Sequence, residues 1–398
     1  MPLLGCEAGV VGVGAASRED RPRWFVATRD GRVRGVDFDD GSVFFDVQTS
    51  FGFPPELTEQ NVIESAATLV ASDDGRYLAV VQRRGAAGGL YEVASGRLLS
   101  ALSREDYHAN VSAWPLAMVR HEGRDVLITS TAWNRLEALE LPSLVRLAPK
   151  EAESKLDYFW GQASVSADGR RLASFGWFWH PVGALRTLDV AAWLSTGVDP
   201  PAELFPAQFA EWWDDSVCWL DDGRVAMRGQ PTASADEIFD APEGVAVVDL
   251  ATQAVQRYFP GVSPSELAFD GTHLVCLGAT TQCLSLETGE VNALLERRTD
   301  AWHPGARVAL TVPQGEELHF ELHWLSGALG TGVPLPATTG TNELLVLADS
   351  LEERGFPQEL VSHCRAGHAH GRRCWVLELL KENDLPPSPR GGEGWGEG

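Results

Sequence analysis

The sequence has few positive charges for its length. Its 398 residues include 32 Lys and Arg against 56 Asp and Glu, a formal net charge of −24 at pH 7. Nucleic acids and anionic membranes are bound largely through Lys and Arg, which displace counterions from phosphate. The charge therefore argues against both as partners. It fits a role in solubility, or attraction to cationic ligands and basic protein surfaces.

Long apolar runs and patterned cysteines are also missing. No run reaches the roughly 20 apolar residues of a membrane helix, and residues 1–6 lack the basic start of a signal peptide. Six cysteines are scattered, at positions 6, 218, 276, 283, 364 and 374, without the spacing of a disulfide-rich secreted domain. These absences predict a cytoplasmic protein with reduced thiols.

A diagnostic catalytic motif is absent as well. A serine hydrolase of the α/β type would carry a Gly-x-Ser-x-Gly elbow, and the sequence has none. What the chain does have is 40 Gly and 23 Pro, spread along its length. Such a distribution is typical of many short turns and favours an all-β architecture.

A hairpin motif recurs along the chain. An apolar strand, an Asp-Gly turn and a second apolar strand appear at 71–80, 165–174 and 219–226, with looser copies at 121–127, 269–275 and 303–309. Seven second turns lie near positions 40, 95, 142, 191, 251, 288 and 326. Their average spacing, about 48 residues, is in the range of propeller repeats. Asp-Gly suits these tight turns because Gly readily adopts positive φ and Asp tolerates it.

Two hairpins per repeat make a four-stranded sheet that cannot bury both of its faces alone. Stacking such sheets around an axis solves this problem. We therefore predict an all-β fold, a seven-bladed β-propeller of four-stranded antiparallel blades, over residues 1–336. A two-domain sandwich of unrelated hairpins is the alternative. The first blade takes four strands of its own from residues 7–16 onward, which leaves two possibilities: ring closure by packing alone, or a shifted first blade.

The repeat units resemble those of WD-repeat-like and other bacterial β-propellers. In those blades a Ser-x-Asp-Gly-Arg-x-Leu-Ala stretch joins the first two strands, as in Ser166-Ala167-Asp168-Gly169-Arg170-Arg171-Leu172-Ala173 here. The resemblance covers residues 5–333 and lacks the Gly-His and Trp-Asp dipeptides of the strict WD repeat. It implies a fold and no particular partner.

After residue 336 the pattern becomes helical, with apolar residues at helix spacing over 342–355 and a Gly stop. Residues 347–355 read Leu-Ala-Asp-Ser-Leu-Glu-Glu-Arg-Gly, which resembles the Ala-Asp-Trp-Leu-Glu-Glu-Arg-Gly signature of a repeat-companion domain of planctomycete and myxobacterial proteins, with Ser350 in place of Trp. We predict a helical module at 337–383. Residues 384–398 bear too little apolar surface to order, so we predict a disordered tail.

Five residues of this module have near-zinc spacing, and a tetrahedral site would take four of them: His363, Cys364, His368, His370 and Cys374. The competing interpretation is a loop between helices, with Cys374 on the buried face of the third helix.

In a propeller, the connections that lead into the innermost strands converge near the axis. Those of this chain combine carboxylates, aromatics, amides and one His, as a ligand pocket requires. The predicted axial ring is Glu64, His108, Asn110, Asp157, Trp160, Trp212, Trp213, Asp215, Glu266, Asp300 and Trp302. The competing interpretation makes the carboxylates solvated loop ends and the tryptophans core. A second aromatic group, Trp177 with Trp133, either stacks on a sugar or base or packs between blades.

The function predicted from these features is binding or scaffolding without catalysis, with a peptide, protein or small ligand on the axial face and no cofactor. The alternative is a metal-dependent hydrolase or lyase that uses His108 and the axial carboxylates to hold a divalent cation such as Ca²⁺.

Overall fold

The computed structural model describes residues 9–16, 21–38, 40–53, 56–57, 63–64, 66–148, 157–178, 182–197, 209–210, 216–221, 223–228, 244–252, 254–295, 298–311 and 321–324. The chain divides into two compact units, Met1–Leu322 and His323–Gly398. The predicted helical module, the tail and the five candidate zinc ligands lie outside the described residues.

The first three sheets take their strands in chain order, and neighbouring strands pair antiparallel. The first sheet comprises β1 (Val10–Ala15), β2 (Arg23–Thr28), β3 (Arg32–Asp37) and β4 (Val43–Gln48). The second comprises β7 (Ala67–Ala71), β8 (Tyr77–Gln82), β9 (Ala87–Glu92) and β10 (Arg97–Ser103). The third comprises β11 (Ala117–His121), β12 (Arg124–Ala132), β13 (Arg135–Glu140) and β14 (Val145–Ala148).

The later sheets repeat this plan. The fourth comprises β15 (Ala163–Val165), β16 (Arg171–Phe178), β17 (Val182–Asp189) and β18 (Phe209–Ala210). The fifth comprises β19 (Val217–Trp219), β20 (Arg224–Arg228), β21 (Gly244–Asp249) and β22 (Ala254–Pro260). The sixth comprises β23 (Glu266–Phe269), β24 (His273–Leu277), β25 (Thr281–Ser285) and β26 (Val291–Leu295). The seventh has three described strands, β27 (Ala301–His303), β28 (Val308–Thr311) and β29 (Glu321–Trp324).

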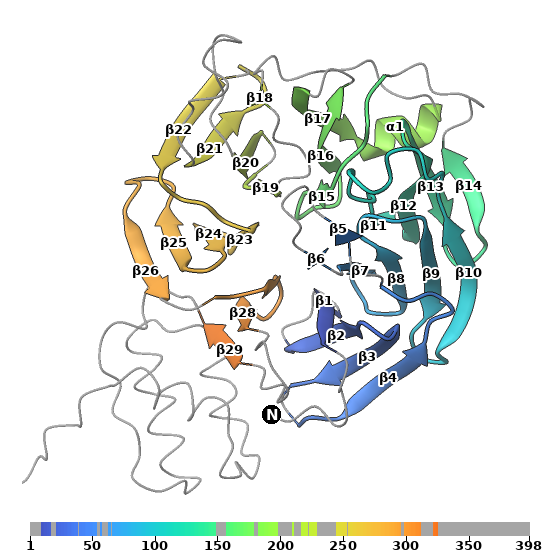
Figure 1. Cartoon of the computed structure of the whole chain (residues 1–398). Helices are drawn as coiled ribbons and strands as arrows, with labels where there is room; N and C mark the ends of the chain where they lie inside the picture. The colour runs from blue at the N-terminus through green and yellow to red at the C-terminus, as the bar shows by residue number, and fades with distance from the viewer. Residues whose placement is uncertain are drawn as a thin grey trace, which may run out of the picture. The chain divides into compact units, whose positions relative to one another are not determined.

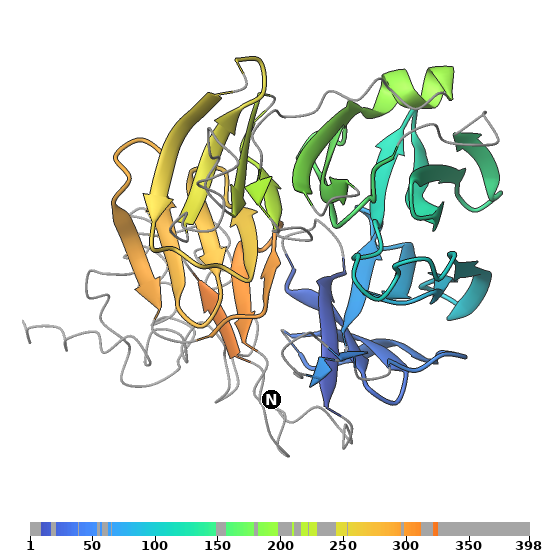
Figure 2. The same cartoon turned by 45° about the horizontal axis from the view of Figure 1, so that its top comes forward.

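The first strand of each sheet lies innermost (Figure 1). Contacts run from β1 to β7, β11, β15, β19 and β23 in turn, and β27 contacts β1. Figure 2 shows the same sheets from a tilted view. This all-β arrangement of four-stranded antiparallel sheets is β-propeller-like, as predicted. No helix in the described residues is long and apolar enough to cross a membrane.

The Asp-Gly turns form where the repeats predicted them. In the second sheet, the Ser72 hydroxyl donates to Asp74 Oδ1 over 2.9 Å, and Asp74 Oδ1 also accepts from the backbone N–H of Arg76. Gly75 follows with φ of 69°, a conformation that costs Gly little. The fourth sheet repeats these contacts with Ser166 and Asp168, so both residue types act locally to set the turn.

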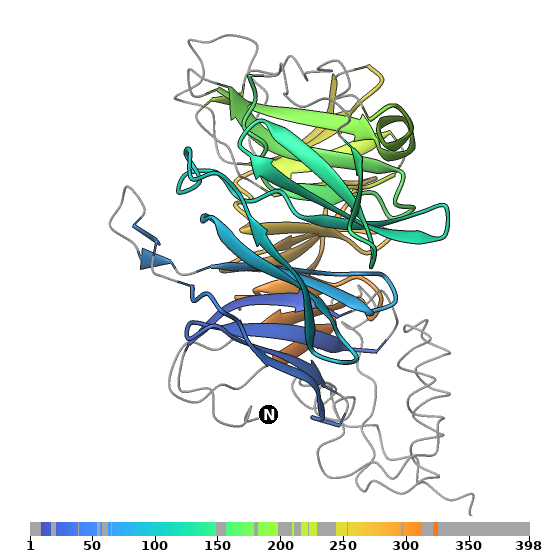
Figure 3. The same ribbon diagram turned by 90° about the vertical axis from the view of Figure 1, so that its right-hand side faces the viewer.

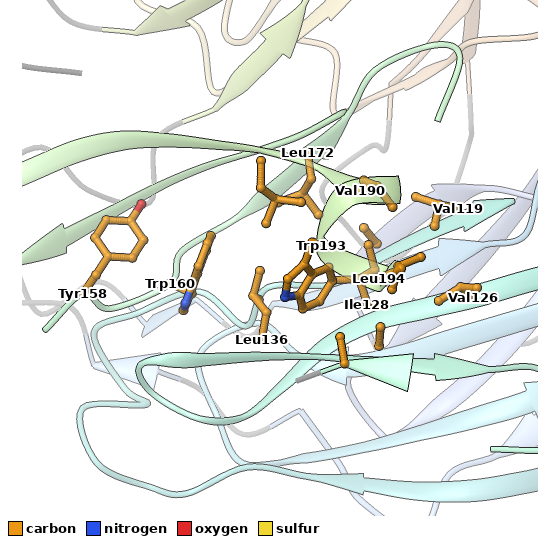
Figure 4. Close-up of a cluster of buried hydrophobic side chains, with 14 of the residues drawn as sticks. Val119, Val126, Ile128, Leu136, Tyr158, Trp160, Leu172, Val190, Trp193 and Leu194 are labelled. Carbon is orange, nitrogen blue, oxygen red and sulfur yellow. The ribbon is translucent and has the colours of Figure 1, made fainter. Parts of the chain in front are cut away.

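The core lies between neighbouring sheets rather than in one centre. The second strands are buried along most of their length because they have a sheet on either side; β8, for example, has five consecutive buried residues. Figure 4 shows the cluster between the third and fourth sheets, where Ile128 and Leu136 meet Leu172 and Trp193. Each sheet thus stabilises the next, which explains why a single repeat could not fold alone.

The second turn expected near residue 191 is replaced by a helix, α1 (Val190–Thr196). The Asp189 side chain accepts a hydrogen bond from Ala192 N–H and caps the helix, which ends at Gly197 with φ of 63°. Trp193 is buried in the cluster between the third and fourth sheets. The expectation of a turn was wrong because this burial and the cap favour a helix over an immediate hairpin.

Two features concern the chain's path around the sheets. A separate two-stranded hairpin, β5 (Glu56–Leu57) with β6 (Ile63–Glu64), projects away from the sheets between β4 and β7 (Figure 3). Among the described strands, the first sheet takes all four from Val10–Gln48, as predicted. The seam with the seventh sheet is made by packing, including an edge-to-face contact between Trp24 and His303 with ring centroids 5.3 Å apart.

Candidate functional site

The predicted connections do lead into innermost strands. Residues 107–112 precede β11, 157–160 precede β15, and 263–266 and 298–300 lead into β23 and β27. We call the end of the sheets at which these strands begin the axial face. Because the strands alternate in direction, the turns between second and third strands lie at this same end.

Four polar side chains from four different sheets form what we call the axial group: Arg83, Gln162, Glu266 and Asp300. Arg83 follows β8 in the second sheet, and its Nη2 lies 3.5 Å from Oε1 of Gln162, just before β15 in the fourth. Arg83 and Asp300 both act electrostatically on Glu266, the first residue of β23 in the sixth sheet. The contact between Arg83 and Gln162 joins the second and fourth sheets, which are not neighbours, so these two side chains lie near the axis.

Glu266 has the most perturbed carboxyl of this group. Its pKa is raised to about 7, chiefly by burial; the positive charge of Arg83 lowers it, and the negative charge of Asp300 raises it. Among the described residues none donates a hydrogen bond to this carboxyl, and no direct ion pair joins it to Arg83. A partly buried carboxyl without a partner is a marker of a functional site.

Asp300 is held in place by its own neighbours. Its Oδ1 accepts from Nε of Arg298 over 2.8 Å, and its backbone N–H donates to the carbonyl of Leu310 over 2.7 Å. The Thr311 hydroxyl in turn donates to the Arg298 carbonyl over 2.6 Å. Asp300 is therefore a fixed negative charge at the edge of the axial group.

Several predicted ring residues lie elsewhere. Trp160 and Trp302 are buried, with exposed fractions of 2% and 9%, so both are core residues rather than accessible pocket walls. Trp160 packs under the guanidinium of Arg186, whose Cζ lies 4.6 Å from the ring centroid. Asp157 and Asn110 are exposed. These four residues fit the competing interpretation, in which the tryptophans are core residues and the polar residues are solvated loop ends.

The remaining predicted ring residues lie outside what the structure describes. Trp212, Trp213 and Asp215 fall in this part of the chain, and for Glu64 only the backbone, in β6, is described.

His108 belongs to a cluster of rings that we call the aromatic stack: Tyr107, His108, Trp133, Phe159 and Trp177. Phe159 and Trp177 stack in parallel with centroids 3.8 Å apart, and the His108 ring stands edge-on to Trp177 at 5.9 Å. The Trp177 Nε1–H donates to the Ser112 hydroxyl over 2.9 Å. The group of Trp177 with Trp133 thus packs between the third and fourth sheets, and only Tyr107, 49% exposed, reaches well into solvent.

Metal and thiol chemistry find little support in the described residues. There, no group of three His, Cys, Asp or Glu side chains is placed to hold a metal ion. Cys218, Cys276 and Cys283 are buried thiols. Burial raises the pKa of Cys218 and of Cys283 to about 12, which keeps both thiols protonated and unreactive.

Two members of the axial group escaped the sequence analysis. Arg83 lies in the turn between β8 and β9, not in a connection that leads into an innermost strand. The sequence does mark Arg83 as unusual, because Arg83 and Arg84 are two adjacent charges in an otherwise apolar stretch. Gln162 immediately precedes β15 and was passed over because no charge or ring marks it.

Comparison with known proteins bears on the fold. No protein-family model matches this chain, and no curated protein matches it in sequence. Among solved structures it is similar to Kuenenia stuttgartiensis hydrazine synthase, a β-propeller protein, with a TM-score of 0.54 and 12% identity over 82% of this chain and 96% of that chain. The likeness is one of fold alone. A propeller can carry many functions, so the function must be argued from the side chains.

Proposed function

We propose that this chain is a seven-bladed β-propeller that binds without catalysing a reaction and takes a peptide, a protein or a small ligand on its axial face. The proposal requires no cofactor, excludes nucleic acid and membranes as partners because of the net charge of −24, and places the protein in the cytoplasm. In this proposal the C-terminal helical module is an accessory to the propeller. The observation that supports it most is the convergence of the axial group from four sheets.

The axial group has both hydrogen-bond donors and hydrogen-bond acceptors that no described residue uses. The Arg83 guanidinium has five N–H donors, and among described acceptors only Gln162 lies near, at 3.5 Å. The Glu266 carboxyl accepts nothing from the described residues. Polar groups with unused donors and acceptors are what orient a ligand in a binding site.

The rival proposal, a metal-dependent hydrolase or lyase, needs at least three converging ligands within roughly 2–3 Å of one point. Of its candidates, His108, Asp157, Glu266 and Asp300 have described side chains, and they form no metal-binding group. His108 packs in the aromatic stack instead. We therefore favour binding.

A ligand screen on the purified full-length chain tests the proposal. Thermal unfolding is followed with small polar metabolites, peptides and divalent cations, and hydrolytic turnover is measured in the same samples. We expect a peptide or small ligand to raise Tm saturably, since a ligand at 100 times its Kd stabilises by about 2.7 kcal/mol. Strong stabilisation by Ca²⁺ together with turnover would contradict binding without catalysis.

Two variants locate the site. Arg83→Met and Glu266→Gln should each weaken the ligand found in the screen at least tenfold, because a hydrogen bond to a charged group contributes about 1.5–3 kcal/mol. Arg97→Met is the matched control: it lies on β10 of the same sheet as Arg83, and its side chain is 64% exposed. Equal loss in all three variants, or in none, would rule out the axial group as the site.

A further inference from the structure

An exposed aromatic ring on the axial face narrows the kind of partner that this face takes. Tyr107, in the connection that leads to β11, is 49% exposed, and no other Phe, Tyr or Trp of the described residues is so accessible. We infer that Tyr107 and the carboxylates beside it bind an arginine side chain of a partner peptide. The inference rests on the proposed binding at the axial face but does not depend on the axial group.

The loop that carries Tyr107 is fixed in shape. The buried guanidinium of Arg104 donates from beneath to the carbonyls of Ala109 and Ser112, over 2.9 and 2.8 Å. His108, the next residue after Tyr107, has a φ of 52°, a conformation that residues other than glycine seldom adopt. Such a conformation persists only where the surrounding contacts impose it. A partner would therefore find the ring already ordered, and little conformational entropy would be lost on binding.

Neighbouring rings hold Tyr107 in one orientation. Its ring lies within 25° of parallel to that of Phe159, with centroids 6.0 Å apart, and the His108 ring stands edge-on to it at 4.5 Å. Trp133, which is half-buried, lies 5.8 Å away on the turn between β12 and β13. The packed side of Tyr107 is thus supported by other rings, and its exposed half is what a partner can reach.

The charges around Tyr107 favour a cation. Glu105 and Asp106 immediately precede it, Asp157 stands two residues before Phe159, and all three carboxylates are exposed. None of the three forms an ion pair or a side-chain hydrogen bond with a described residue. A cation over the ring would gain from the negative face of the aromatic system and from these carboxylates together.

The chain itself shows how arginine satisfies such a combination. The Arg76 guanidinium lies over the Tyr77 ring, with its Cζ 5.5 Å from the centroid, and it also donates to Asp74 and to Asp125, each over 2.6 Å. A planar guanidinium can stack and bind carboxylates at once, whereas the ammonium of lysine is a compact and strongly hydrated charge. No guanidinium of the described residues lies over Tyr107, so this ring is open to an arginine from elsewhere.

The probe is the acetylated and amidated peptide Gly-Arg-Gly-Arg-Gly, titrated into the full-length protein by calorimetry at pH 7. One matched peptide has lysine in place of arginine, which keeps the charge but not the plane. A second has citrulline, which keeps the plane but not the charge. We expect the arginine peptide to bind saturably and at least about twofold more tightly than either matched peptide.

Variants locate the contact. Tyr107→Ser removes the ring from an exposed position and should weaken the arginine peptide about two- to fivefold, the effect of one exposed cation–π contact, whereas Tyr107→Phe should keep most of the affinity. Asp106→Asn should weaken binding and reduce its dependence on NaCl, because salt screens exposed charges. Leu98→Ser is the matched control, since Leu98 is 46% exposed on β10 and lies outside the aromatic stack.

Three results would overturn the inference: equal binding of the three peptides, equal loss in Tyr107→Ser and Leu98→Ser, or no saturable binding up to about 10 mM peptide. Maltose, a neutral sugar, is titrated in parallel. If maltose binds through Tyr107 and the arginine peptide does not, the exposed ring serves a sugar and the inference is wrong.

The two proposals fail in different ways. If the wider screen yields a ligand that depends on Arg83 and Glu266 while no peptide depends on Tyr107, the proposed function stands and this inference is wrong. If the arginine peptide depends on Tyr107 but no ligand depends on Arg83 or Glu266, the axial face binds and the axial group is not its site. If no ligand depends on any of these residues, both proposals are wrong.

Discussion

At the scale of single residues, surroundings decide chemistry that the residue type leaves open. Glu266 is an ordinary acid at the start of a strand, and in an open chain its carboxyl would be ionised at neutral pH. Burial and the neighbouring Asp300 instead raise its pKa to about 7. At physiological pH it therefore exists in both forms, which suits a group that responds to a ligand's charge.

Glu266→Gln should change the pH dependence of stability. The folded pKa of Glu266, about 7, exceeds its ordinary value of 4.5, so the folded state holds a proton that the unfolded state loses. The carboxyl therefore destabilises the fold increasingly as pH rises from 4.5 to 7, by roughly 1–3 kcal/mol. The Tm of the variant minus that of the wild type should rise between pH 4.5 and 8. A flat difference would show that the pKa of Glu266 is not raised.

At the scale of elements, α1 shows how a short helix can form inside an all-β unit. Its seven residues are too few to be stable alone, so tertiary packing must support it. That support comes from Val190, Trp193 and Leu194, all buried, and from the cap at Asp189.

Asp189→Ala should remove the cap and lower the free energy of unfolding by about 1 kcal/mol, the usual cost of losing a capping side chain. Denaturant unfolding followed by Trp fluorescence measures this. Ser195→Ala, an exposed position of the same helix, is the control and should change stability by less than about 0.5 kcal/mol. If both variants behave alike, the cap does not stabilise α1.

At the scale of the whole first unit, the last sheet must meet the first, and His303 lies at that seam. Its side chain is fully buried, its Nδ1 accepts from Ala306 N–H over 3.0 Å, and its ring stands against Trp24. Burial lowers its pKa to about 4. The neutral ring is thus part of the packing that holds the seam.

Acid should weaken this seam. The His303 pKa is lowered from 6.5 to about 4, so the unfolded state takes up a proton first as pH falls through this range. His303 contributes fully above pH 6.5 and should lose about 3 kcal/mol by pH 4. His303→Asn should therefore be destabilising at pH 7 but less so at pH 4. His121→Asn, at a side chain 24% exposed, is the control.

Glu266 acts in the opposite direction over an overlapping pH range, so each difference must be taken against the wild type at the same pH. If His303→Asn loses as much stability between pH 7 and pH 4 as the wild type does, protonation of His303 is not the cause of the loss.

The hairpins could be predicted because their signals are local. Asp74 and Asp168 shape their turns through contacts within a few residues, and period-two apolar strands show directly in the sequence. Of the predicted ring, Glu266 and Asp300 do lie in one group, whereas Trp160 and Trp302 are core. A tryptophan near the axis looks the same in sequence whether it lines a pocket or packs between sheets.

The sequence by itself determined the repeated hairpins, their turns and the acidic surface, since each depends on neighbouring residues or on composition. Only the tertiary structure decided that Arg83 meets Gln162, that burial raises the pKa of Glu266, and that His303 closes against Trp24. The physical reason is distance along the chain. Charges as far apart along the chain as Arg83 and Glu266 act on each other only after the sheets have packed, and burial, which changes their chemistry, arises from that packing alone.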